Sequence, residues 1–109
     1  MKVAIIGSRT ISIENIEDYI PQGTTEIVSG GAKGVDSCAK RFAKENNLIY
    51  TEFLPEYKKY GRAAPIKRNY QIVEYADVII ALCNGTSKGT KSVIDYCKKS
   101  RKEILVYTL

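Results

Sequence analysis

Five short apolar runs alternate along this chain with segments whose apolar residues recur at helical spacing. The runs are "KVAIIG", "TEIVSG", "LIYTEFL", "DVIIALC" and "EILVYTL", and they predict five β-strands. Their apolar residues are largely contiguous rather than alternating with polar ones, which is typical of strands in a parallel sheet covered on both faces. The fourth run, residues 77–83, is the most strongly apolar and is expected at the centre of that sheet.

Helical patterns lie between these runs. The clearest stripe, at i, i+3, i+4, i+7 and i+8, consists of Val35, Cys38, Ala39, Phe42 and Ala43. The other three segments are "SIENIEDYI", with Ser12 as an N-cap, "PIKRNYQIVEYA", with Pro65 in its first turn, and "KSVIDYCKKS". Strand–helix alternation throughout predicts one α/β domain, residues 1–109, with a parallel sheet between layers of helices.

Composition narrows the class of protein. The chain has 109 residues, 44% of them hydrophobic, which suffices for one packed core. The first apolar stretch, "VAIIG", is too short for a signal peptide and lacks a cleavage site. The longest later one, "ADVIIALC", is too short to span a bilayer. We therefore expect a soluble, cytoplasmic protein with no membrane partner.

Several kinds of chemistry are disfavoured by what the sequence lacks. It contains no histidine, which removes Ser-His and Cys-His nucleophile pairs and the commonest metal ligand. Its three cysteines, Cys38, Cys83 and Cys97, are far apart and form no CxxC pair, so neither a disulfide framework nor a zinc site is indicated. We predict no metal site.

Positive charge is concentrated after the third predicted strand. The chain has a formal net charge of +5, and residues 55–70, "PEYKKYGRAAPIKRNY", carry five cations and one anion, a net charge of +4. Tyr57, Tyr60 and Tyr70 lie among these charges, an arrangement typical of binding to single-stranded nucleic acid or a nucleotide. The alternative interpretation is a solvated face whose tyrosines pack on their own helix. Because this segment follows the third predicted strand, it is expected at the same edge of the sheet as the other strand ends, where it could fold over a ligand as a lid.

Glycine or hydroxyl clusters follow the first, second and fourth predicted strands. They are "GSRTIS", "SGGAKG" and "NGTSKGT", at residues 7–12, 29–34 and 84–90. Because the carboxyl ends of parallel strands share one edge, the three loops are expected on one rim. The opposite strand ends carry ordinary breakers, "PQG", "ENN", "AD" and "SRK". Ligands of open α/β sheets bind outside the carboxyl ends, at the point where the strand order reverses, so we expect the site at this rim.

The chemistry of the rim suits a phosphorylated ligand. Two of its loops meet predicted helix N-termini, at Gly34 and Gly89, where unpaired N–H groups and a partial positive charge attract phosphate. Cationic donors are supplied by Arg9, Lys33 and Lys88. Neither the dinucleotide fingerprint G-x-G-x-x-G nor the P-loop G-x-x-x-x-G-K-[ST] is present.

A purely structural interpretation of the same loops stays open. Glycine is favoured at tight strand–helix corners whatever their function. Asp36 either complements the dipole of the helix that it begins or binds a ribose hydroxyl. Ser87 and Thr90 are either helix caps or phosphate ligands.

The motifs "VAIIGSR", "VSGGAKGVDSCAKRFA", "PIKRN", "ADVIIAL" and "TSKGT" occur in the order found in the SLOG superfamily, which the chain resembles over nearly its whole length. This Rossmann-like group contains the DNA-processing protein DprA/Smf and the LOG nucleotide phosphoribohydrolases, and the likeness is greatest to small stand-alone domains related to YspA and YpsA. The resemblance implies a three-layer αβα fold with a five-stranded parallel sheet of order 3-2-1-4-5. It also implies a nucleotide or ADP-ribose-like ligand.

The loops and the resemblance together give one set of candidate ligand-binding residues. They are Gly7, Ser8, Arg9, Gly30, Gly31, Ala32, Lys33, Gly34, Asp36, Arg62, Arg68, Asn69, Ser87, Gly89 and Thr90. The favoured function is a small module that binds or senses a phosphorylated nucleotide or an NAD-derived ligand. Families that the chain resembles often dimerise, which leaves a homodimer open.

Two other functions stay open. The SGxAxGxD loop and the RN pair of DprA, which binds single-stranded DNA, resemble residues 29–36 and Arg68–Asn69, so DNA binding is the main alternative. The LOG motif PGGxGTxxE carries a glutamate used to cleave an N-glycosidic bond, but "TSKGTKSVID" has no carboxylate there and Asp95 follows too late. Asp36, the one rim carboxylate identified, is then the candidate catalytic base of a hydrolase, and the balance favours a protein that is not an enzyme.

Overall fold

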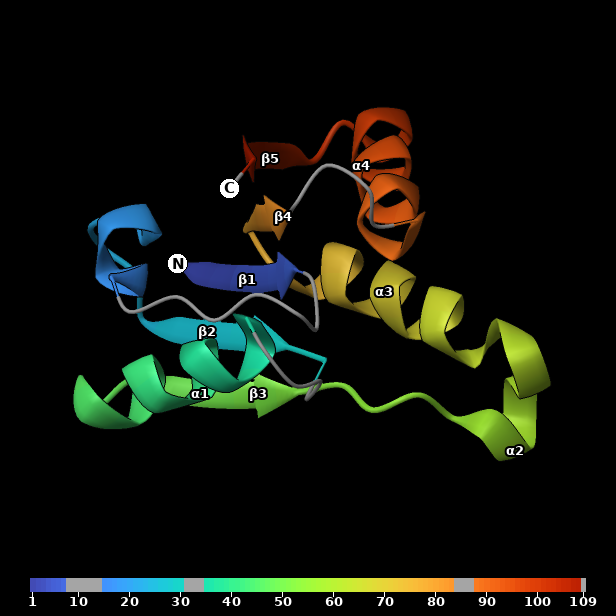
Figure 1. The fold of residues 1–109 in the computed structure, drawn as a ribbon, viewed down its shortest axis with the longest axis horizontal. Helices are drawn as coiled ribbons and strands as arrows, with labels where there is room; N and C mark the ends of the chain where they lie inside the picture. The colour runs from blue at the N-terminus through green and yellow to red at the C-terminus, as the bar shows by residue number, and fades with distance from the viewer. Residues whose placement is uncertain (8–14, 31–34, 84–87, 109) are drawn as a thin grey trace.

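The computed structural model describes residues 1–7, 15–30, 35–83 and 88–108, and at residues 35, 36, 83 and 88–90 it describes the backbone alone. Its five strands are β1 (Lys2–Gly7), β2 (Glu26–Ser29), β3 (Ile49–Glu52), β4 (Val78–Cys83) and β5 (Glu103–Thr108). All neighbouring strands pair in parallel, in the order β3-β2-β1-β4-β5 (Figure 1). The sheet and its strand order are as predicted.

Helices cover both faces of this sheet. They are η1 (Ile16–Tyr19, a 3-10 helix), α1 (Val35–Glu45), α2 (Tyr57–Tyr60), η2 (Gly61–Ala63, also 3-10), α3 (Ala64–Tyr75) and α4 (Lys88–Ser100). One core cluster joins Val3 and Ile5 of β1 to η1 and α1, and the other joins Ala4 and Ile6 to α3 and α4. The result is a three-layer, Rossmann-like α/β fold.

Alternation along β1 explains why two cores form. Successive side chains of a strand point to opposite faces, so Val3 and Ala4 enter different clusters although both are fully buried. The α1 stripe packs through Ala39 and Ala43, whose small side chains allow the helix to lie close to the sheet. Cys38 and Cys97 are buried on opposite faces, so these two cysteines do not pair with each other.

Two segments differ from their prediction. A helix was expected over residues 12–20, and the described part of this stretch holds only the 3-10 turn Ile16–Tyr19. Ile20 is already extended (φ −91°, ψ 121°), because the residue before a proline, here Pro21, is disfavoured in the helical region. The basic segment, expected as a loop, contains the short helices α2 and η2. None of the helices in the described stretches is long and apolar enough to cross a membrane.

Candidate functional site

The strand order reverses between β1 and β4. From β1 the chain moves outward through β2 to β3, and from β3 it passes back over the sheet to β4 and then β5. The two central strands pair up to their carboxyl ends, where Gly7 lies opposite Leu82. A crevice outside the carboxyl ends is formed at such a reversal because the flanking connections leave on opposite faces. This is the place predicted for the ligand.

The described part of the chain brings only some candidates to this rim. Gly7 ends β1 and the buried Gly30 directly follows β2. The backbones of Asp36 and of Gly89 and Thr90 lie in the first turns of α1 and α4. Outside the described residues lie Ser8, Arg9, Gly31, Ala32, Lys33, Gly34 and Ser87, and their roles stay predictions.

Arg68 contacts the carboxyl ends of two strands. Its Nη1 donates to the carbonyl oxygen of Gly30 at 2.8 Å and, more distantly, to that of Phe53 at 3.5 Å. Its Nε donates to Oδ1 of Asn69 at 2.8 Å. Three predicted site residues, Gly30, Arg68 and Asn69, are therefore in one cluster. The guanidinium of Arg68 thus binds backbone carbonyl groups at the rim of the sheet.

Glycine at position 30 is required by this contact. A Cβ added there would lie 2.4 Å from Nη1 and 2.7 Å from Cζ of Arg68, far inside van der Waals distance. The guanidinium thus occupies the space that any other side chain at this position would need. The sequence predicted a glycine that lets a phosphate approach, whereas the described contact at Gly30 is with an arginine.

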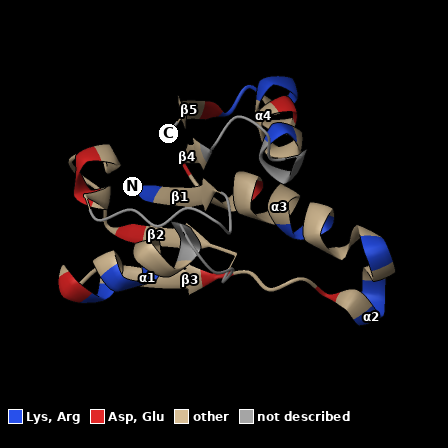
Figure 2. Ribbon diagram, in the orientation of Figure 1, with Lys and Arg blue, Asp and Glu red and all other residues tan. Residues whose placement is uncertain are grey.

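The basic segment extends beyond the rim. Figure 1 shows α2 well past the carboxyl ends of β1, β2 and β3, and Figure 2 shows lysine and arginine along α2 and the start of α3. Lys58, Lys59, Arg62 and Lys67 are exposed, unlike the half-buried Arg68. The segment lies on the side of the sheet where a lid was predicted, and its cations face solvent.

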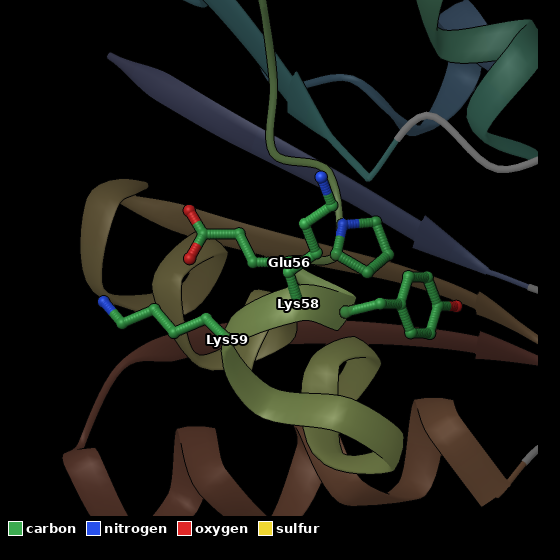
Figure 3. Close-up of a pocket in the computed structure, with 5 residues that line it drawn as sticks. Glu56, Lys58 and Lys59 are labelled. Atoms are coloured by element: carbon green, nitrogen blue, oxygen red, sulfur yellow. The ribbon is translucent and has the colours of Figure 1, made fainter.

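A shallow depression lies on this segment. It has a volume of about 530 Å³ and is lined by five consecutive residues, Pro55, Glu56, Tyr57, Lys58 and Lys59 (Figure 3). In Figure 3 the amine of Lys59 and the carboxylate of Glu56 extend on the same side of α2. All of the depression's lining residues belong to one short stretch of chain, and no other element of the described chain closes over it. The exposed ring of Tyr57 forms part of its wall.

The three tyrosines of the basic segment have different environments. Tyr70 stacks on Tyr96 of α4, with ring centroids 4.2 Å apart and planes at 21°. Tyr96 in turn donates to Oε1 of Glu74 at 2.7 Å, and this hydrogen bond to a carboxylate raises the pKa of Tyr96. Tyr70 therefore packs α3 against α4, whereas the structural interpretation expected it to pack on its own helix. Tyr60 is half-buried, with Nζ of Lys59 5.2 Å from its ring centroid, while Tyr57 is 59% exposed.

A hydrogen-bonded trio at the ends of β2 and β3 was missed by the sequence analysis. The hydroxyl of Tyr50 lies 2.6 Å from Oγ of the buried Ser29 and donates to Oε1 of Glu52 at 3.1 Å. Glu52 is exposed at the carboxyl end of β3, so the rim carries a carboxylate besides Asp36. Period-two alternation along the strand places residues 50 and 52 on one face, and this is the sequence signal for the pair.

A second missed cluster lies at the opposite end of β2. The carboxylate of Glu26, only 8% exposed, accepts from the hydroxyls of Tyr75 and, at 2.7 Å, Thr51. The hydrogen bond to Glu26 raises the pKa of Tyr75, whose ring also lies 4.3 Å from Nζ of Lys2. Glu26 begins β2, far from the rim, so this cluster fastens the end of α3 to the sheet.

Over the parts of the chain that the structure describes, no group of three or more histidine, cysteine, aspartate or glutamate side chains could hold a metal ion. Burial raises the pKa of Cys97, which disfavours the reactive thiolate there. Comparisons with protein-family models, with curated proteins and with solved structures found no match to this chain. What the protein binds is therefore inferred from its own residues and topology.

Proposed function

We propose that this protein is a SLOG-type module that binds a phosphorylated, nucleotide-derived small molecule at the carboxyl rim of its sheet. The supporting observation is that two helices begin after strands at the carboxyl edge of the sheet, one after β4 and one after β2, the strands on either side of β1. Helix α4, of 13 residues, starts at Lys88 soon after β4 ends at Cys83. Helix α1, of 11 residues, starts at Val35 soon after β2 ends at Ser29. Helices of this length direct unpaired N–H groups toward an anion.

The sheet order supports the SLOG assignment, because order 3-2-1-4-5 is the one that the resemblance implies. In the proposed complex the glycine loops, Arg9 and Thr90 hold phosphate, and Asp36 accepts from a ribose hydroxyl. Tyr57 is the base-stacking residue of the basic segment. Arg68 donates a hydrogen bond to the carbonyl oxygen of Gly30 and so holds the residue that follows β2.

Isothermal titration calorimetry with AMP, ADP-ribose and NAD tests this proposal. We expect one-to-one, saturable binding of at least one of them. Arg9→Ala removes a charge-assisted hydrogen bond and is expected to weaken binding about tenfold or more, since such a bond contributes roughly 1.5–3 kcal/mol. The matched control is Lys98→Ala, which removes the same charge from the last turn of α4, away from the rim. Binding unchanged in Arg9→Ala, or equally weakened in the control, contradicts the proposed phosphate site.

Single-stranded DNA is the second candidate ligand. The observation that favours it is the exposed ring of Tyr57 beside the exposed cations Lys58 and Lys59 on α2. Binding through these groups should weaken steeply with salt because counterions are released from the phosphates. Lys59→Ala should lower the salt dependence by about one counterion. If the chain binds an oligonucleotide but none of the three small molecules, and Gly31→Val leaves oligonucleotide binding unchanged, the proposed small-molecule pocket is refuted.

A further inference from the structure

Strand β5 has one side without a strand partner in the described chain. It ends the sheet order and pairs in parallel with β4 over six consecutive residues, from Glu103 opposite Val78 to Thr108 opposite Cys83. Figure 1 shows β5 at the margin of the sheet. Two neighbouring aliphatic side chains, Leu105 and Val106, are 38% and 45% exposed, and alternation places them on opposite faces.

Strand β5 carries few of the usual devices that protect an edge strand, and its one charged residue is Glu103 at its start. Edge strands avoid pairing with other chains by being short, by carrying charges or proline, or by bulging. Between Ile104 and Thr108 there is no charge and no proline, and the unbroken register with β4 leaves no bulge. The other edge strand, β3, has four residues, ends in Glu52 and is soon followed by Pro55. Of the two edge strands of the described sheet, β5 is therefore the more open to pairing.

We propose that the β5 edge pairs antiparallel with β5 of a second copy of this chain, so that the two sheets become continuous in a twofold homodimer. A twofold axis perpendicular to the sheet keeps corresponding faces on the same side, and residues opposite each other across the strands share a face. Leu105 then faces either Leu105 or Tyr107 of the second copy. In neither register do two like charges lie opposite each other; in the first, Glu103 lies opposite Tyr107.

The charge distribution favours a second copy in this orientation. Lysines and arginines gather where α4 ends and β5 begins (Figure 2), at Lys98, Lys99, Arg101 and Lys102. Antiparallel pairing puts the two positive clusters at opposite ends of a strand about 20 Å long, roughly two Debye lengths at physiological salt. Parallel pairing would bring them side by side. Antiparallel pairing of β5 with itself therefore keeps the two positive clusters apart, which parallel pairing does not.

Sedimentation velocity over a wide range of protein concentration tests the proposal. We expect the unmodified chain to sediment as a dimer at high concentration, and Val106→Lys, which introduces a charge into the edge, to sediment as a monomer. The matched control is Ile49→Lys, the same kind of change at a 62% exposed position of the other edge strand, and it should leave the dimer intact. A monomeric unmodified chain, a dimeric Val106→Lys, or loss of the dimer in Ile49→Lys alone would overturn it.

Hydrogen exchange keeps the test independent of whether Val106→Lys folds. In the unmodified chain, the β5 amides that do not bond to β4 should exchange more slowly at high concentration than at low concentration. Exchange that is independent of concentration at these amides contradicts the pairing. If β5 instead binds an acidic strand of another protein, the isolated chain stays monomeric, which also counts against the dimer. No nucleotide is added, so failure here leaves the proposed rim site untouched.

Discussion

The guanidinium of Arg68 and the carbonyl oxygen of Gly30, 2.8 Å apart, join helix α3 to the carboxyl end of β2. This contact exists only because position 30 has no side chain. It connects the part of the basic segment that lies in α3 with the first residue of the loop predicted to hold phosphate, so a change at either residue is expected to affect both.

Gly30→Ala should lower the free energy of unfolding by about 1–3 kcal/mol, because the new Cβ displaces the guanidinium and leaves the Gly30 carbonyl without its charged donor. The measurement is urea denaturation of a double-mutant cycle with Arg68→Ala. In the Arg68→Ala background the same glycine substitution should cost much less, since nothing occupies the space. Additive effects would show that the two residues do not interact.

Tyr57 and Tyr70 should respond in opposite ways to substitution by leucine. Tyr70→Leu removes a stacked aromatic pair and should lower the free energy of unfolding by about 1 kcal/mol, without changing ligand affinity. Tyr57→Leu, at a position 59% exposed, should change stability by less than about 0.5 kcal/mol.

The Tyr57 substitution should instead weaken binding. If this ring stacks on a base, its loss costs roughly 1–3 kcal/mol of affinity, about tenfold or more. Chemical denaturation and calorimetric titration with AMP and an oligonucleotide measure both properties on each variant. Binding lost in Tyr70→Leu but kept in Tyr57→Leu would reverse these assignments.

Much of the fold follows from local pattern. The five apolar runs and the α1 stripe predict strands and a helix because each has the period of its element, and the alternation of elements then implies a parallel sheet. The rim follows in turn, because loops after parallel strands share an edge. The run at residues 77–83 predicted a central strand, and β4 is an interior strand beside the middle strand β1, with Ile79 and Ile80 fully buried.

Other features depend on contacts that no local pattern encodes. Helix α2 has four residues, too few for a hydrophobic period to develop. The pairing of Arg68 with Gly30 joins residues 38 positions apart. Likewise, the sequence gives Tyr70 and Tyr57 similar charged surroundings, and only the packing of α3 against α4 distinguishes them. The surroundings of a side chain in the basic segment could not be predicted, because its partners come from distant parts of the chain.

Stability should depend on pH in the acid range through Asp77. This carboxylate accepts from the backbone N–H of Lys2 at 2.7 Å, and the hydrogen bond lowers the pKa of Asp77. A carboxyl whose pKa is lower in the folded than in the unfolded state stabilises the fold above the ordinary value of about 3.9, and this contribution disappears as pH falls through the folded pKa.

Asp77→Asn should therefore be less stable than the unmodified chain at neutral pH, and the difference should vanish in strong acid. Thermal melts across pH 7 to about 2 measure the two curves. Asp18→Asn is the matched control, because this exposed carboxylate accepts a local hydrogen bond, from Nδ2 of Asn15 at 2.9 Å. A constant difference across this range would rule out the charged form of Asp77 as the cause.

Tyr75 should give the opposite behaviour in the alkaline range. Its hydroxyl donates to the buried carboxylate of Glu26, and this raises the pKa of Tyr75 above its ordinary value. A group whose pKa is higher in the folded state stabilises the fold fully below the unfolded pKa, about 10, and the contribution is lost as pH rises through the folded pKa. Tyr75→Phe keeps the ring contact with Phe53 but removes the hydroxyl, so it should be less stable at pH 7 and should approach the unmodified chain above pH 10 or so. Denaturation in urea at a series of pH values measures this, and a gap that persists or widens in alkali would mean that the phenol does not act through its proton.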